Sequence, residues 1–118
     1  MAEFFSLADL SQGLARELAP GVNTRIFPGE QAMLSVVTLA PNAAGNIHSH
    51  PEEQWGLLLE GSGVRTQGGV GHPVVKGDFW RTPGGMEHGL VAGPEGCTVL
   101  DVFAPPREAY KRAGSGFS

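Results

Sequence analysis

The sequence predicts one all-β domain over residues 1–118, closed into a barrel or a jelly roll. Three observations indicate this. A chain of 118 residues fits one domain with one core. The 18 glycines and 9 prolines are spread between short apolar runs, as turns between strands would be. With 41% hydrophobic residues the chain is not low-complexity disorder, and eight or more short strands favour a closed β fold.

The first segment, residues 1–21, has two interpretations. Four leucines recur at helix-like spacing, namely Leu7, Leu10, Leu14 and Leu18. Gly13 interrupts that pattern and Pro20-Gly21 ends it. The segment is therefore either an arm or edge strand, or a pair of helical turns.

The barrel is expected over residues 22–104, where strand patterns alternate with turn signals. A turn is expected at Gly61–Gly63. After Pro105-Pro106, residues 107–112 read as a short C-terminal helix, followed by a loose tail to residue 118. The expected strands cover residues 22–27, 33–39, 47–50, 54–60, 64–67, 74–75, 79–82, 89–92 and 98–103.

Charge and composition exclude several classes of protein. The net charge is −4 and there is no basic run, so a nucleic-acid partner is not expected. The start Met-Ala-Glu-Phe-Phe has no signal-peptide pattern, and no apolar run approaches membrane-spanning length. We expect a soluble cytoplasmic protein with no membrane partner. Cys97, the single cysteine, reads as a small buried strand residue rather than a nucleophile.

Three histidines and a glutamine have the spacing of one metal site. His48 and His50 are two residues apart, so on a strand both side chains face the same way. Gln54 shares their parity, and His88 follows a turn at the end of another strand. Imidazoles and an amide oxygen suit one divalent transition metal: zinc, nickel, iron, manganese or copper. Because these ligands are neutral, such an ion would be a strong Lewis acid.

These residues lie in two motifs that resemble those of small single-domain cupins of the RmlC-like, Cupin_2 type. The first family motif is G-x5-H-x-H-x3,4-E-x6-G, and the second is G-x5-P-x-G-x2-H-x3-N. The second begins here at Gly77 and reaches His88. Asn42 replaces the first glycine, Gln54 the glutamate and Ala92 the final asparagine. The resemblance implies a double-stranded β-helix with the metal inside it.

Within that family, the sequence His-Ser-His-Pro-x-Glu-Gln is similar to that of a KdgF-type subgroup. Members of this subgroup convert 4,5-unsaturated monouronates into their linear keto form. The segment from Asp101 through Phe103 to Arg107 resembles that subgroup's Asp-x-Phe-x-x-x-Arg. The resemblance implies that all three line the active site. Asp101 would move a proton, Arg107 would clamp a carboxylate and Phe103 would pack on the sugar ring. The alternatives are a turn-capping or ion-paired Asp101, an exposed Arg107 and a core Phe103.

Other residues have weaker functional interpretations. Arg65 and Arg81 lie on expected strands and are interpreted as solvated, although either could reach an anionic substrate. His72 is expected in a turn and outside the metal site. The side chains of Trp55, Leu57 and Leu59 have the opposite parity to Gln54 and face away from the metal. An N-terminal strand or a partner must cover them, and we favour a homodimer.

The leading hypothesis is a metal-dependent enzyme that ketonises an unsaturated monouronate or a related cyclic enol acid. Its substrate would be a small anionic sugar acid. Two alternatives remain. One is an iron- or nickel-dependent dioxygenase of a small chelating substrate, and the other is a metal- or sugar-binding module without turnover.

Overall fold

The structure is a computed structural model that describes residues 3–111 and 114–116. Nearly all regular structure in this part of the chain is β-strand, as the sequence predicts. The strands are β1 Leu14–Ala19, β2 Val22–Pro28, β3 Met33–Leu39, β4 Glu53–Gln67, β5 Val70–Val75, β6 Phe79–Thr82, β7 His88–Ala104 and β8 Gly114–Ser115.

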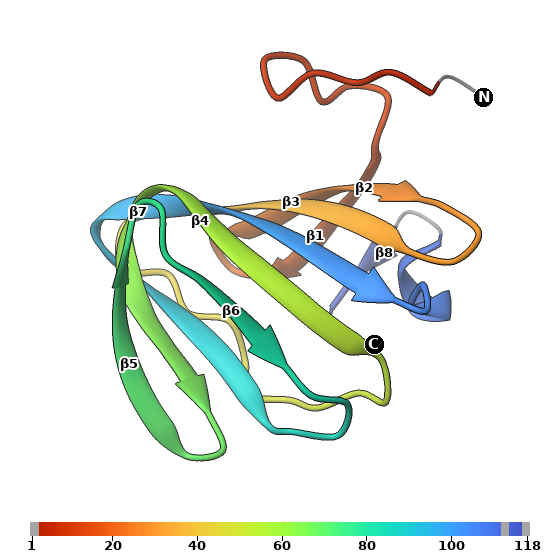
Figure 1. Cartoon of the computed structure of the whole chain (residues 1–118). Helices are drawn as coiled ribbons and strands as arrows, with labels where there is room; N and C mark the ends of the chain where they lie inside the picture. The colour runs from red at the N-terminus through yellow and green to blue at the C-terminus, as the bar shows by residue number, and fades with distance from the viewer. Residues whose placement is uncertain (1–2, 112–113, 117–118) are drawn as a thin grey trace.

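The strands form one folded sheet with the order β5-β4-β7-β3-β2-β1-β8, and β6 pairs with β4 outside this path. The two long central strands, β4 and β7, pair antiparallel along their whole length. Their far ends pair with different neighbours, β5 and β6 on one side and β3 on the other. The sheet therefore folds into two layers that join along β4 and β7 (Figure 1), which gives a jelly-roll β fold.

The predicted turn at Gly61–Gly63 is wrong, because the chain passes through it as part of β4. The register of β4 on β7 shifts between Leu58 and Glu60, where β4 has one extra residue, and again between Gly61 and Gly63, where β7 has the extra residues; neither shift ends the pair. Gly61 has φ +84°, and a Cβ there would collide with the carbonyl oxygen of Gly96. The two expected strands at 89–92 and 98–103 are likewise one strand, β7.

The core fills the space between the two layers. Along β3, Met33, Val37 and Leu39 are buried on the inner face, with Ser35 between them. From β7, Val99 and Phe103 face the same interior, and Leu58 joins them from β4. Alternation along strands thus separates an apolar interior from the outer face.

β1 and the C-terminal strand β8 pack side by side at one edge of the sheet. The N-terminal edge strand is present as β1, although the segment before it is a series of turns outside the two layers (Figure 1). The predicted helix over 107–112 is wrong: only a single 3-10 turn, Glu108–Tyr110, forms, and residues 112–113 lie outside the described part. A run of about six residues is fewer than two α-helical turns, too few to form a stable α-helix on its own.

The predicted loose tail is also wrong for residues 114–116. β8 pairs in parallel with β1. Buried Arg16 donates hydrogen bonds to the carbonyl oxygens of Ala109, Ser115 and Gly116 at 3.1, 2.8 and 2.7 Å. The guanidinium of one strand residue thereby ties the C-terminal segment to the sheet.

Of two further local predictions, the strand at residues 47–50 is wrong and the left-handed backbone at Asn42 is confirmed. Residues 47–50 form no strand; a single bridge joins His48 to His88. Asn42, at the position where the family motif has glycine, does adopt a left-handed backbone with φ 61°. No helix among the described residues is long and apolar enough to cross a membrane.

Candidate metal centre

Three separate segments bring the predicted ligands together at one end of the interior. His48 lies in the connection after β3, His50 directly precedes β4, and His88 begins β7. The backbone of His48 pairs with that of His88 through N–H···O bonds of 3.0 and 2.9 Å in the two directions. The ligand atoms of the three imidazoles all lie within 4.8 Å of one another. The sequence prediction that these histidines share one site is confirmed in this geometry.

Each imidazole is oriented by a backbone carbonyl two residues away. The Nδ1 atoms of His48, His50 and His88 lie 2.9, 3.0 and 2.8 Å from the carbonyl oxygens of Asn46, Glu52 and Met86. If Nδ1–H donates to that oxygen, Nε2 keeps its lone pair for the centre of the site. Each carbonyl lies two residues before or after its histidine, so the contact that would set the tautomer is local.

Burial keeps the imidazoles neutral. It lowers the pKa of His48 and His50, with Arg107 adding to the effect, and it lowers the pKa of His88 to about 3. The Nε2 atom of His88 is buried and has no hydrogen-bond partner among the described residues. A buried unsatisfied nitrogen that faces two other imidazoles is what a metal ligand looks like without its ion.

Gln54, the fourth predicted ligand, lies beside the histidines on the inner face of β4, with only 4% of its surface exposed. Its Oε1 lies 3.0 Å from Nε2 of His50, while its amide nitrogen donates a hydrogen bond to the Asp101 carboxylate. Asp101 thus turns the amide so that its oxygen, and not its nitrogen, faces the imidazoles. Three imidazole nitrogens and one amide oxygen fit a divalent transition metal, and this donor set leaves the identity of the ion open.

The name metal cup is used for the group His48, His50, Gln54 and His88. The two other predicted β7 residues, Asp101 and Phe103, lie beside it. Asp101 is opposite Ser35 on β3 and Gly56 on β4, and its Oδ1 is buried without a partner among the described residues. Burial raises the pKa of Asp101 to about 6, against the opposing effects of Arg65 and of the Gln54 hydrogen bond. The Phe103 ring packs on the His50 ring with centroids 5.5 Å apart.

Arg107 is buried rather than exposed, and its charge is close enough to lower the pKa of His48 and His50. Its side chain, like that of His50, is not among those that line the cavity around His48, His88 and Asp101. Its guanidinium lies over the rings of Tyr110 and Phe103, at 4.2 and 5.8 Å, and 3.9 Å from Glu52. Arg107 therefore supports the wall of the site from behind.

Two residues were missed or misjudged in the sequence. Arg65, interpreted as solvated, is 5% exposed and reaches the cavity. Tyr110, the single tyrosine, also lines it, and burial raises its pKa to about 12. The one available signal for Tyr110 was its position three residues after Arg107. Arg81, by contrast, is exposed and pairs with Glu53 at 3.5 Å, as interpreted, and His72 is exposed on β5 rather than in a turn.

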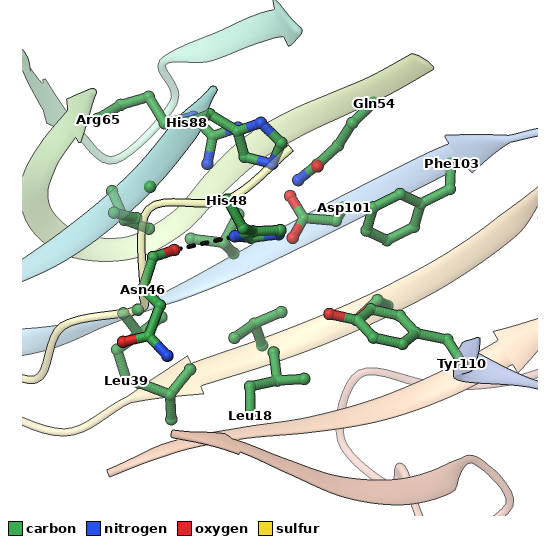
Figure 2. A pocket seen from close by; sticks show the side chains of 17 residues that line it. Leu18, Leu39, Asn46, His48, Gln54, Arg65, His88, Asp101, Phe103 and Tyr110 are labelled. Atoms are coloured by element: carbon green, nitrogen blue, oxygen red, sulfur yellow. Dashed lines mark hydrogen bonds between the residues drawn. The ribbon is translucent and has the colours of Figure 1, made fainter. Parts of the chain in front are cut away.

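The cavity is small, with polar side chains at one end and apolar side chains opposite them. Figure 2 shows His48, His88, Gln54 and Asp101 at one end, and Leu18 and Leu39 across from His48. Its volume of about 50 Å³ holds a few water molecules. The inner site therefore admits a metal ion with a small ligand group, and a larger substrate would extend past the Asn46–His48 rim.

A profile of the cupin domain, Cupin_2, matches residues 35–103, which is more than half of the chain and includes all four predicted ligands. The chain belongs to the cupin family. Over 72 residues, 61% of its length, this cupin is 41% identical to the dimethylsulfoniopropionate lyase DddW of Ruegeria pomeroyi. The match covers 47% of that enzyme, so the cupin spans about half the length of this curated relative.

Solved structures agree on the fold. An RmlC-like cupin from Shewanella frigidimarina superimposes with a TM-score of 0.80 at 25% identity, covering 92% of this chain and 96% of its own. KdgF from Halomonas sp. superimposes equally well, with a TM-score of 0.80 over 92% of this chain and 98% of its own. At 24% identity the likeness to KdgF shows the fold alone.

Proposed function

We propose that this cupin is a metal-dependent enzyme that converts a small cyclic enol acid, foremost a 4,5-unsaturated monouronate, into its linear keto form. The observation that supports this most directly is the placement of Asp101. Its carboxylate accepts a hydrogen bond from the ligand Gln54, while its Oδ1 is buried and unsatisfied next to the cup. A proton carrier therefore lies beside the position where the substrate's oxygen would be polarised.

His48, His50, Gln54 and His88 would hold the metal, which when bound supplies Lewis-acid polarisation of substrate oxygens. The conversion is an isomerisation and needs no co-reactant. The hydroxyl at C1 loses its proton, the bond between C1 and the ring oxygen breaks, and C4 gains a proton as the enol at C5 becomes a ketone. Asp101 would accept the hydroxyl proton and donate it to C4, so that the carboxylate ends the cycle as it began.

The remaining residues shape the site. Phe103, buried against His50, closes one wall to water, and Tyr110 packs edge-on against Phe103 at 5.7 Å. Arg107 stacks on Tyr110 and, in this proposal, positions both rings. The structure therefore supports a positioning role for Arg107 in place of the carboxylate contact that the sequence resemblance implied.

The test is the ultraviolet absorbance of a 4,5-unsaturated monouronate incubated with metal-loaded protein. Protein stripped by chelator is the control, because such substrates also open spontaneously. We expect faster loss of the conjugated-acid band with the loaded protein. D101N should lose at least about 100-fold of this activity yet retain its metal, because asparagine keeps an acceptor oxygen for Gln54. Activity of D101N within a few-fold of wild type would exclude Asp101 as the proton carrier.

A second candidate function is a lyase acting on a small sulfonium carboxylate. The 41% identity to a dimethylsulfoniopropionate lyase favours it. So does the apolar wall of the cavity, because buried sugar hydroxyls would lack partners there. Asp101 would take the proton next to the carboxylate while the carbon–sulfur bond breaks, releasing dimethyl sulfide and acrylate. Gas chromatography of dimethyl sulfide distinguishes this reaction from ketonisation.

The oxygenase and the non-catalytic module stay open as outcomes of the same experiments. Oxygen uptake with a chelating substrate would indicate the first. Ligand-induced stabilisation without any product would indicate the second.

A further inference from the structure

Arg65 is a buried cation inside the metal cup that neither motif includes. It lies on the second half of β4, opposite Leu90 on β7 and His72 on β5. Its side chain lines the same cavity as His48, Gln54, His88 and Asp101, and Figure 2 shows it next to His88. Only 5% of the residue is exposed.

Neutral groups fix its guanidinium on one side. Nη2 donates to Thr82 Oγ1 at 2.9 Å, and Nε donates to Gln67 Oε1 at 3.2 Å. Thr82 donates to the same Gln67 oxygen at 2.6 Å, which closes a triangle of hydrogen bonds. The guanidinium also lies 5.4 Å from the Trp80 ring. The cation is therefore held in one orientation before any ligand arrives.

These contacts do not neutralise the charge of Arg65, and the Asp101 carboxylate acts on it only from beyond ion-pair distance. Within the described residues, no carboxylate lies within 4.0 Å of the guanidinium, and Nη1 makes no hydrogen bond. A buried charge without an ion pair is costly unless a bound anion completes it. The planar fork of an arginine fits a carboxylate, which can accept two of its N–H groups at once.

The other two arginines near the site are less suited to this task. Arg107 is stacked on Tyr110 outside the cavity lining, and Arg81 is an exposed residue paired with Glu53. A divalent metal would add two positive charges close to Arg65, against the single negative charge of Asp101. The inner cup as a whole therefore favours an anion.

We propose that Arg65 binds the carboxylate of the substrate and makes the cup selective for small carboxylic acids over their neutral analogues. This deepens the proposed function by naming the group that recognises its substrate class. The binding step itself is independent of which reaction follows, because both candidate substrates carry a carboxylate.

The test measures binding of propionate and of its neutral analogue propionamide by calorimetry. It uses the full chain, both metal-loaded and stripped. We expect wild type to bind propionate at least about 10-fold more tightly than propionamide in both forms. R65Q should lose about 10- to 100-fold of the propionate affinity, the range of a charge-assisted hydrogen bond, with little change for propionamide. R65K should recover part of the loss, because it restores the charge without the fork.

R81Q is the matched control, since it removes the same charge from the neighbouring strand at the surface, and its affinity should stay within two-fold of wild type. Circular dichroism checks that R65Q is folded; if it is not, R65K against R81K makes the same comparison. Equal losses in the Arg65 and Arg81 variants, or no preference of wild type for propionate, would overturn the proposal. Carboxylate binding without turnover of the uronate would instead refute only the proposed reaction.

Discussion

At the scale of single residues, the site combines neutral metal ligands with one carboxylate held in an unfavourable place. Asp101 is surrounded by Gln54, Ser35 and Gly56, and burial raises its pKa to about 6 from an ordinary value of 3.8. The folded protein therefore holds the proton of Asp101 more tightly than the unfolded chain does. This contribution to stability is present below about pH 3.8 and is lost as the pH rises through about 6.

D101N should consequently stabilise the metal-free protein at pH 7, where wild type buries a charged carboxylate. We expect a gain of about 1–3 kcal/mol in the free energy of unfolding, from a pKa difference of about two units. Urea denaturation of both proteins, stripped of metal, measures it at pH 7 and at pH 4. The gain should shrink toward zero at pH 4. A D101N protein less stable than wild type at pH 7 would show that the carboxylate stabilises the fold instead.

The grouping of His48, His50 and His88 was predictable because the two sequence motifs place these residues at fixed offsets. Strand parity was not the reason, because residues 47–50 form no strand and His48 meets His88 through a single bridge. Arg65 was not predictable in this way. Its burial depends on the register shift between Leu58 and Glu60, where one extra residue of β4 moves odd-numbered residues to the inner face that Gln54 and Leu58 occupy before it. The available signal was the pair Gly61 and Gly63, since glycines inside a strand pattern often mark a bulge.

At the scale of elements, the register shifts of β4 on β7 bend the sheet and place Arg65 on its inner face. Gly61 has φ +84° and lies against the backbone of Gly96. The sequence indicated a chain break there because Gly-Ser-Gly is typical of turns. The structure shows that β4 pairs with β7 on both sides of it, and this long-range pairing outweighs the local turn preference.

G61A should therefore destabilise the protein by at least about 2 kcal/mol, because it adds both backbone strain and a collision with the Gly96 carbonyl. Gly69 is the matched control. It has φ +81°, but no atom lies within 4 Å of the point that an added methyl group would occupy. G69A should lose only the strain, about 1 kcal/mol. Thermal or urea unfolding compares the two, and equal losses would mean that the close approach at Gly61 contributes nothing.

At the scale of the whole molecule, the sequence predicted the all-β jelly roll but not how its ends are held. Alternating apolar positions specify the strands and their inner faces. The parallel β1–β8 pairing depends on Arg16 meeting carbonyl oxygens about a hundred residues later in the chain, and no local pattern signals that contact. The same limit explains the wrong C-terminal helix, since residues 108–110 fold against the sheet edge.

Exposed apolar residues on the outer face of the sheet are the reason to predict a homodimer. Leu34, Trp55 and Phe79 are exposed there, as the parity of Trp55 and Leu57 predicted. An apolar groove continues this face between the N-terminal segment and β2–β3, lined by residues such as Phe5 and Phe27. We propose that a second copy of the chain covers this surface, because an isologous contact would bury both apolar faces at once.

Light scattering after gel filtration tests this proposal. Wild type at tens of micromolar should have the mass of a dimer, and L34E should shift toward the monomer while staying folded. V70E, which adds the same charge to an exposed apolar residue on β5, should stay dimeric. A monomeric wild type, or equal dissociation of both variants, would contradict it.

Metal content is the measurement that shows whether the three imidazoles and Gln54 form one metal site. Protein is saturated with nickel or zinc, desalted and measured by inductively coupled plasma mass spectrometry. We predict about one ion per chain in wild type and in H72Q, whose histidine is exposed outside the cup, and a loss of most of the metal in H88Q. No retained metal in wild type, or equal retention in H88Q and H72Q, would contradict a shared site.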